Sequence, residues 1–141
     1  MTEVNKNKEI AWRWMDLISE HKIEEICEMI APDWQMYGGP PNLPAGEKGI
    51  RELFRHIGEV RQTWTIEDTI AEGDKVVIRA TNTCEQESFF GVPARGVVQK
   101  FTATFTHQIS GGKIRATWRN ADDLGRIFQI GGRIEAAARQ L

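Results

Sequence analysis

The sequence has few of the features that mark disulfide-bonded, metal-binding or membrane proteins. Its 141 residues include only two cysteines, Cys27 and Cys84, which stand in neither a Cys-x-x-Cys motif nor a cluster with histidine. We therefore expect no disulfide framework and no metal site. No apolar run approaches the roughly 20 residues needed to cross a bilayer. The charged start MTEVNKNKEIAWRW lacks the apolar core of a secretory signal, so we expect a cytoplasmic protein with no membrane partner.

The sequence also lacks an excess of charge of either sign. Its 18 basic and 20 acidic residues are interleaved and leave a formal net charge of -2, which gives no electrostatic reason to expect nucleic acid as a partner. The hydrophobic content of 40% and the charged content of 27% are ordinary for a globular protein. The length suits one domain with a continuous core, and we expect residues 1–141 to form it.

Hydrophobic periodicity predicts helices in the first part of the chain and strands in the rest. Helical spacing covers 4–20 and 22–30, and it returns around Ile50 to Ile57 after a loop rich in glycine and proline. A short strand is expected at 34–37. Two-residue alternation predicts strands at 63–71, 75–86, 97–110 and 113–122, the last two joined by a tight turn at Gly111-Gly112. A short helical segment should follow the last strand, and the tail at 133–141 should be either helical or frayed.

This order of elements predicts an α+β fold. Helices that precede an antiparallel meander are expected to pack on one face of its sheet. The sequence shows no alternation of strands and helices and no glycine-rich phosphate loop, so a parallel nucleotide-binding fold is not expected.

The alternation of side chains along the strands places a few polar residues on the buried face of the sheet. His107 shares its face with the apolar residues of its strand, and Asn82 does so in the strand at 75–86. In the last strand, Asn120 and Asp122 continue the series that begins with Ile114. A carboxylate on an apolar face is costly unless it is paired or its pKa rises. A raised pKa is what a general acid or base near neutral pH requires.

Each of these residues also has a structural interpretation. A lone buried histidine such as His107 is more often a hydrogen-bonded core residue than a catalyst. Asp122 lies where its strand ends, so it would equally well cap a following helix by accepting backbone N–H bonds. Asn82 and Asn120 are more often structural than functional. Periodicity alone leaves both interpretations open.

Five motifs, in the same order, resemble those of one family. In WRNADDLGRIFQIG a strand tryptophan is followed four residues later by an aspartate, then by Leu-Gly and by a Gln-hydrophobic-Gly ending; the matching residues are Trp118, Asp122, Leu124, Gly125, Gln129, Ile130 and Gly131. The segments PNLPAGEKGIRELF, GDKVVIR, FGVPARG and SGGKI supply the other four motifs. Together they resemble the SnoaL-like polyketide cyclases over about residues 8–132.

The resemblance implies both a fold and an activity. The fold would be the cone-shaped α+β barrel of the nuclear transport factor 2-like superfamily, with a curved, mostly antiparallel sheet wrapped around the N-terminal helices and an internal apolar cavity. The activity would be cofactor-independent closure of a polyketide ring by intramolecular aldol condensation, or a related isomerisation, on a hydrophobic carbonyl compound. Asp122 matches the family's general acid/base, and such proteins are usually homodimers.

On this basis we expect a catalytic pair and a pocket around it. Asp122 would be the general acid/base, and His107 would assist it. His107, Asn82 and Tyr37 would hydrogen-bond the developing enolate. The remaining substrate-binding residues would be Trp34, Phe54, Phe101, Phe105, Trp118 and Asn120, most of them apolar walls. The outer face of the sheet would form the dimer interface through Arg79, Thr81, Thr102, Thr104, Arg115 and Thr117.

The sequence departs from the family pattern at two places. Thr83-Cys84-Glu85 stands where many members have Gly-Thr-His, and Tyr37 stands where many have histidine. These changes leave two alternatives open: a non-catalytic small-molecule-binding or assembly module, and a steroid-isomerase-like enzyme. The epoxide hydrolases of the superfamily need an Arg-x-Asp pair. Here Arg79 is followed by Ala80-Thr81, so that mechanism lacks its parts.

Overall fold

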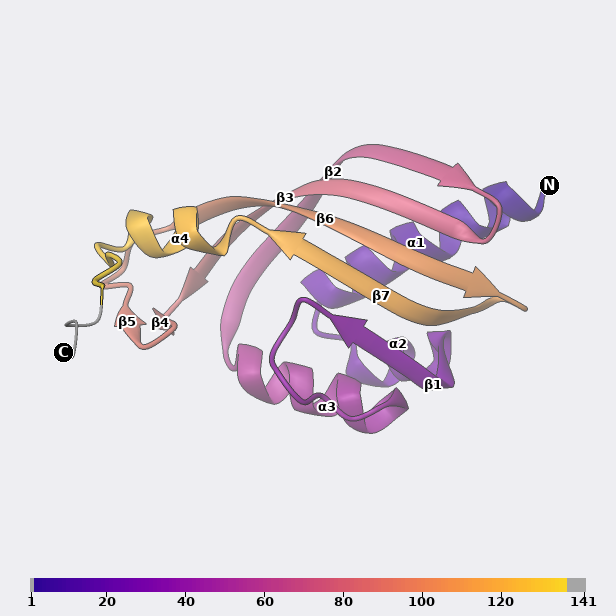
Figure 1. Ribbon diagram of the computed structural model, residues 1–141, viewed down its shortest axis with the longest axis horizontal. Coiled ribbons are helices and arrows are strands. Elements are labelled where there is room, and N and C mark those ends of the chain that lie inside the picture. The colour runs from indigo at the N-terminus through magenta and orange to yellow at the C-terminus, as the bar shows by residue number, and fades with distance from the viewer. Residues whose placement is uncertain (1, 137–141) are drawn as a thin grey trace, which may run out of the picture.

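A curved sheet of five strands forms the framework of the protein in the computed structural model, which describes residues 2–136 (Figure 1). The strands are β1 (Ile30–Tyr37), β2 (Val60–Glu72), β3 (Lys75–Gln86), β6 (Gln99–Ser110) and β7 (Lys113–Ala121). Their order in the sheet is β1-β7-β6-β3-β2. Only the edge strand β1 runs parallel to its neighbour, β7, and the other pairs are antiparallel. The expected α+β class is confirmed.

Three helices cover one face of this sheet. They are α1 (Glu3–Ser19), α2 (Ile23–Met29) and α3 (Gly46–Ile57), close to the ranges that periodicity predicts. The buried residues of α1 pack against the middle of the sheet, where the Trp14 and Phe105 rings meet edge to face with centroids 5.6 Å apart. None of the described helices is long and apolar enough to cross a membrane.

Two small elements lie beyond one end of the sheet. A minimal hairpin, β4 (Ser88–Phe89) and β5 (Val92–Pro93), occupies a segment that the sequence marks only as a turn region. The helix α4 (Asp123–Gln129) then lies against β6, where the Gln129 side chain bonds the backbone N–H and C=O of Lys100. Residues 132–136 form neither helix nor strand, and the rest of the expected tail lies outside the described residues.

Strand β1 begins four residues before the short strand that we expected at 34–37. The chain is already extended from Ile30 onward, and Pro32 lies inside the strand. The pairing of β1 with β7 skips from Ile30 to Gln35. Proline, which lacks an N–H to donate, is tolerated in this unpaired stretch of an edge strand.

Two irregularities change which side chains face the helices. In β7, Ile114 pairs with Ile109 while Ala116 pairs with Gln108, so Arg115 is an extra residue without an opposite partner. Such a bulge reverses the alternation beyond it. Thr117 is therefore fully buried, although we expected it on the outer face. A similar shift in β2 turns Ile70 outward, where it is 66% exposed.

Candidate functional site

The interior face of the sheet carries its polar side chains mainly at two ends. At the hairpin end, where the β2–β3 and β6–β7 turns lie, His107 pairs across the sheet with Thr117. At the opposite end, which we call the α4 end, Cys84 pairs with Gln62 on one side and with Gln99 on the other. Figure 1 shows α4 and the β4–β5 hairpin at this second end, away from the tight turns.

Six of the ten predicted site residues are buried, as expected: Trp34, Phe54, Asn82, Phe101, Phe105 and His107. They do not form one cluster. Asn82 and Phe101 are paired neighbours toward the α4 end, whereas Phe105 and His107 lie toward the hairpin end. The alternation rule is therefore correct for β3 and β6, whose mutual pairing runs without a register shift.

The inward orientation that we expected for the other four residues is wrong. Tyr37 is 48% exposed and stacks on Trp118, with the ring centroids 5.4 Å apart. Trp118 itself pairs with Thr106 on the outer face, and Asn120 and Asp122 are exposed. The cause is the bulge in β7, because the alternation that predicts an inward Trp118 assumes a strand without an extra residue.

Asp122 is the N-terminal cap of α4. Its carboxylate Oδ1 accepts the backbone N–H of Gly125 at 2.9 Å, in the usual geometry of a helix cap. The carboxylate packs so closely over Gly125 that a Cβ atom there would lie 2.2 Å from Oδ2. The structural interpretation that the sequence left open thus describes the observed position of Asp122.

His107 lies in a sealed polar cluster at the hairpin end. Its Nδ1 is 2.8 Å from Thr117 Oγ1, which also accepts a hydrogen bond from Trp34 Nε1 at 3.0 Å. The Trp14 ring covers the imidazole edge on, with the centroids 4.6 Å apart. Burial lowers the pKa of His107 to about 3, so the imidazole is neutral at physiological pH. These contacts are those of a packed core histidine.

A second buried cluster, at the α4 end, surrounds Arg126 of α4. The Arg126 guanidinium donates to Gln99 Oε1 at 2.5 Å and also to Gln86 Oε1. It lies over the Phe89 ring at 3.7 Å and over the Phe101 ring at 4.7 Å. The side chain is only 6% exposed, and burial lowers the pKa of its guanidinium. The cluster brings together α4, β3, β6 and the β4–β5 hairpin.

Beside this cluster, Asn82 belongs to a polar chain that leads toward the surface. Asn82 Nδ2 donates to Gln62 Oε1 at 3.0 Å, and Gln62 Nε2 lies 3.2 Å from His21 Nε2. Two buried atoms nearby, Asn82 Oδ1 and Trp64 Nε1, have no hydrogen-bond partner among residues 2–136. Leaving such a group unpaired costs about 1–3 kcal/mol, so a water or ligand that pairs with these two atoms would stabilise the protein.

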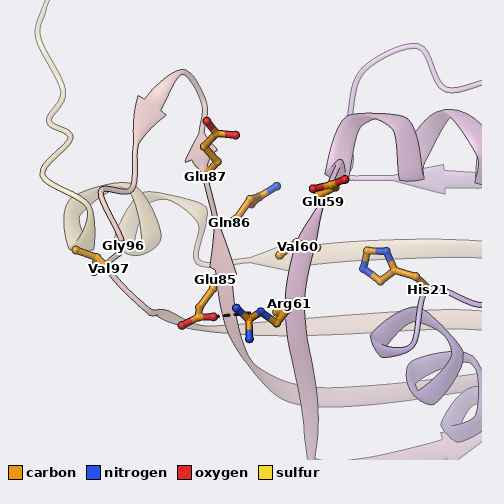
Figure 2. A pocket seen from close by; sticks show the side chains of 9 residues that line it. All are labelled: His21, Glu59, Val60, Arg61, Glu85, Gln86, Glu87, Gly96 and Val97. Carbon is orange, nitrogen blue, oxygen red and sulfur yellow. Dashed lines mark ion pairs between the residues drawn. The ribbon is translucent and has the colours of Figure 1, made fainter.

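An open hollow of about 620 Å³ adjoins both groups (Figure 2). Gln86 contributes to its wall, and His21 lies at its other side. The rim is charged, and Figure 2 shows Arg61 and Glu85 facing each other there, with an N–O distance of 3.5 Å. A second hollow next to it includes Gln62 and Cys84 in its lining. Both hollows lie at the α4 end and are open to solvent.

Sequence reasoning missed several residues of this end: His21, Gln62, Gln86, Gln99 and Arg126. Strand parity contained a signal for Gln99, which shares its face with Phe101. No comparable signal existed for Arg126, because the packing of α4 on β6 determines where its side chain lies. Within the part of the chain that the structure describes, no group of three or more His, Cys, Asp or Glu side chains is arranged to hold a metal ion.

Comparison with known proteins gives a family and a fold. The sequence profile of the SnoaL-like domain family matches residues 11–117. A search among curated proteins found no match. A protein from Bacillus cereus ATCC 10987 that has been assigned as a polyketide cyclase is 25% identical, with a TM-score of 0.72; the match covers 89% of this chain and 80% of that chain.

Two further solved structures share the fold at lower identity. A protein from Jannaschia sp. CCS1, assigned to the SnoaL-like polyketide cyclases, has a TM-score of 0.79 at 20% identity and covers 95% of this chain and 98% of that chain. An LEH-like epoxide hydrolase of M. tuberculosis has a TM-score of 0.73 at 14% identity, with 92% of each chain covered. Proteins of different chemistry thus share this architecture.

The burial of His107 predicts a pH dependence of stability. In the unfolded chain an imidazole takes up a proton below about pH 6.5, whereas folded His107, with a pKa of about 3, does not. The stability that neutral His107 contributes is therefore fully present above pH 6.5 and is lost as the pH falls. Between pH 6 and pH 5 the free energy of unfolding should fall by about 1 kcal/mol more in the wild type than in His107→Phe. Urea unfolding at each pH measures this difference. If the free energy of unfolding fell equally with pH in the wild type and in the variant, His107 would not be sealed from solvent.

Proposed function

Because this chain belongs to the family of SnoaL-like domains, we propose that it binds a hydrophobic, carbonyl-bearing small molecule at the α4 end of its sheet. The most direct support comes from Asn82 Oδ1 and Trp64 Nε1, the two unpaired buried atoms on facing residues of β3 and β2. One is an acceptor and the other a donor. A ligand with a carbonyl oxygen and an enol or hydroxyl group would pair with both.

The surroundings of these atoms suit such a ligand. Phe101 pairs with Asn82 on its other side, and its ring meets the Trp64 indole edge on at 5.6 Å, so an apolar wall adjoins the polar pair. Sites for small molecules combine apolar walls with a few placed polar groups in this way. Gln62, which lines one hollow and bonds Asn82, lies between the pair and the surface. We infer that the ligand enters past this amide.

A matched pair of probes tests the proposal. The aromatic ketone 2-acetonaphthone has a carbonyl group, whereas 2-ethylnaphthalene has the same ring system without one. We expect the ketone to bind about five- to tenfold more tightly, because one neutral hydrogen bond contributes roughly 1 kcal/mol. Equilibrium dialysis measures both affinities. Trp64→Phe keeps an aromatic ring but removes the N–H donor, and it should abolish the preference for the ketone.

Trp12→Phe is the control for this substitution. Trp12 is 39% exposed, and its Nε1 already donates to Thr69 Oγ1 at 2.8 Å. This variant should keep the preference for the ketone. Equal affinity of the wild type for both probes would refute carbonyl recognition at Trp64.

A second candidate function is turnover of the bound molecule in a reaction of the polyketide-cyclase type, without a cofactor. It is favoured by the match of Asp122 to the family's general acid/base and by the fold shared with proteins assigned as polyketide cyclases. Asp122 would remove a proton α to the carbonyl group, and ring closure or isomerisation would follow. For this the carboxylate would have to leave the Gly125 N–H that it now caps. A steroid-isomerase-like reaction would use the same proton transfer.

Exchange of α-protons for deuterium reports on this chemistry directly. If Asp122 is the base, the protein should accelerate exchange at the methyl group of 2-acetonaphthone in D₂O, followed by NMR. Asp122→Asn should slow this exchange by roughly a hundredfold. The amide keeps an oxygen that can cap α4, so the fold should persist. Asp123→Asn, at the neighbouring carboxylate that pairs with Arg119, should change it little. If exchange is no faster with the protein than in buffer alone, the proposed proton abstraction by Asp122 is refuted and only the binding function remains.

We also propose that the protein forms a homodimer through the outer face of the sheet. Cross-strand pairing aligns Ile70, Val77, Thr106, Trp118 and Tyr37 in one row across all five strands. Four of the five side chains are apolar or aromatic, and the row is at least partly exposed. Contiguous exposed apolar surface of this kind is typical of protein interfaces.

Light scattering coupled to size exclusion tests the dimer. The wild type should show twice the mass of one chain at micromolar concentration. Ile70→Glu places a charge in the apolar row and should give a monomer, because the charge would be buried in the interface. Ile134 is similarly exposed, at 70% compared with 66% for Ile70, and lies outside the sheet, so Ile134→Glu should remain dimeric. A monomeric wild type would refute the interface.

A further inference from the structure

Arg126 is a buried cation without an acidic partner. Its guanidinium is held by the neutral groups Gln99 Oε1 and Gln86 Oε1, with Cys84 Sγ at 3.5 Å from Nη2. Phe89 and Phe101 cover it with their rings. Each of these contacts orients the charge, and none of them neutralises it. Among residues 2–136, no acceptor is found for Nη1.

The nearest candidate for a counter-charge is already engaged. Asp123, on the same helix, forms two hydrogen bonds with Arg119, at 2.7 and 2.9 Å. Within the described part of the chain, no carboxylate forms an ion pair with Arg126. A guanidinium stays charged in proteins, and a buried charge is ordinarily paired. A bound anion would supply the acidic partner that the described part of the chain does not.

We propose that Arg126 is the anion-recognising residue of this site and that its ligand is a small aromatic or polycyclic carboxylate. This inference rests on the proposed small-molecule binding and specifies the chemical class of the ligand. A planar guanidinium matches a carboxylate in shape and charge. Phe89, which is partly exposed, supplies flat apolar surface beside the guanidinium for the body of the same molecule.

Gln86 connects the buried Arg126 with the hollow at the surface. Gln86, which accepts from the guanidinium, also lines the hollow of about 620 Å³, a volume suited to a molecule of several rings. The Phe89 ring that covers the charge comes from the minimal β4–β5 hairpin. Arg126 also occupies a position that the shared motif leaves open, between Gly125 and Gln129.

The rim of the hollow carries acidic residues, which bear on how an anion would bind. Glu85 pairs with Arg61, while Glu59 and Glu87 also line the hollow. These groups repel an anion in the outer part of the hollow, where water screens the charges. At Arg126, away from bulk water, the attraction is much stronger. We therefore expect selectivity to arise at Arg126 and not at the rim.

The experiment compares 2-naphthoate with 2-acetonaphthone, which has the same ring system and carries no charge. Equilibrium dialysis against the wild type should give an affinity for 2-naphthoate at least about tenfold higher, as a charge-assisted hydrogen bond predicts. Arg126→Met keeps an apolar side chain under the rings and removes the charge. It should lose that advantage and keep the affinity for the ketone. Arg13→Met removes an exposed cation of α1, which lies outside the lining of the hollow, and should leave the advantage intact.

The outcomes separate this inference from the proposed function. Ketone binding without a preference for the carboxylate would overturn the role of Arg126 and leave the proposed function standing. A carboxylate preference that survives in Arg126→Met would overturn it as well. Binding of neither probe to the wild type would refute both. If Arg126→Met does not fold, as judged by circular dichroism, Arg126→Lys serves instead. It keeps the charge without the planar fork and should reduce the carboxylate advantage severalfold, and an unchanged advantage would count against the inference.

Discussion

One extra residue in β7 determines which side chains the last strand presents to the helices. Without a bulge at Arg115, Trp118 and Asn120 would face the interior, and Asp122 would continue that series. With it, Thr117 takes the interior position, where its hydroxyl hydrogen-bonds His107 Nδ1 and Trp34 Nε1. The bulge thus builds the polar cluster at the hairpin end and, seven residues further on, leaves Asp122 free to begin α4.

The arrangement of α4 follows from the end of β7. Asp122 caps the helix through the Gly125 N–H, and Gln129 fixes its other end to the backbone of Lys100 in β6. Between these two attachments, one turn of helix carries Arg126 into the interior. Asp122 and Gln129, both part of the motif that resembles the SnoaL-like cyclases, therefore have a direct structural role in placing the Arg126 cluster.

Sequence patterns predicted the fold well because, in most strands, buried and exposed side chains alternate without interruption. The strand expected at 75–86 is β3. In β3 and β6, the buried side chains are those of the alternating series that contains the apolar residues. The same reasoning failed in β7, because Ile114, Ala116 and Trp118 also alternate regularly and only the pairing with β6 reveals the extra residue. The site was predicted less well than the fold. Its polar residues come from four elements, β2, β3, β6 and α4, and from the turn between α1 and α2. Their convergence depends on tertiary packing that no local pattern encodes.

His107 and Arg126 are both buried, but they differ in charge. At the hairpin end, burial keeps His107 neutral, and its Nδ1 hydrogen-bonds the neutral hydroxyl of Thr117. At the α4 end, the guanidinium of Arg126 cannot lose its proton, so the protein carries the cost of a buried charge there. Replacing a buried charged group by an apolar one is often neutral or stabilising. A cation that is held in place by two amides and two rings, but not neutralised, is therefore better explained by binding than by stability.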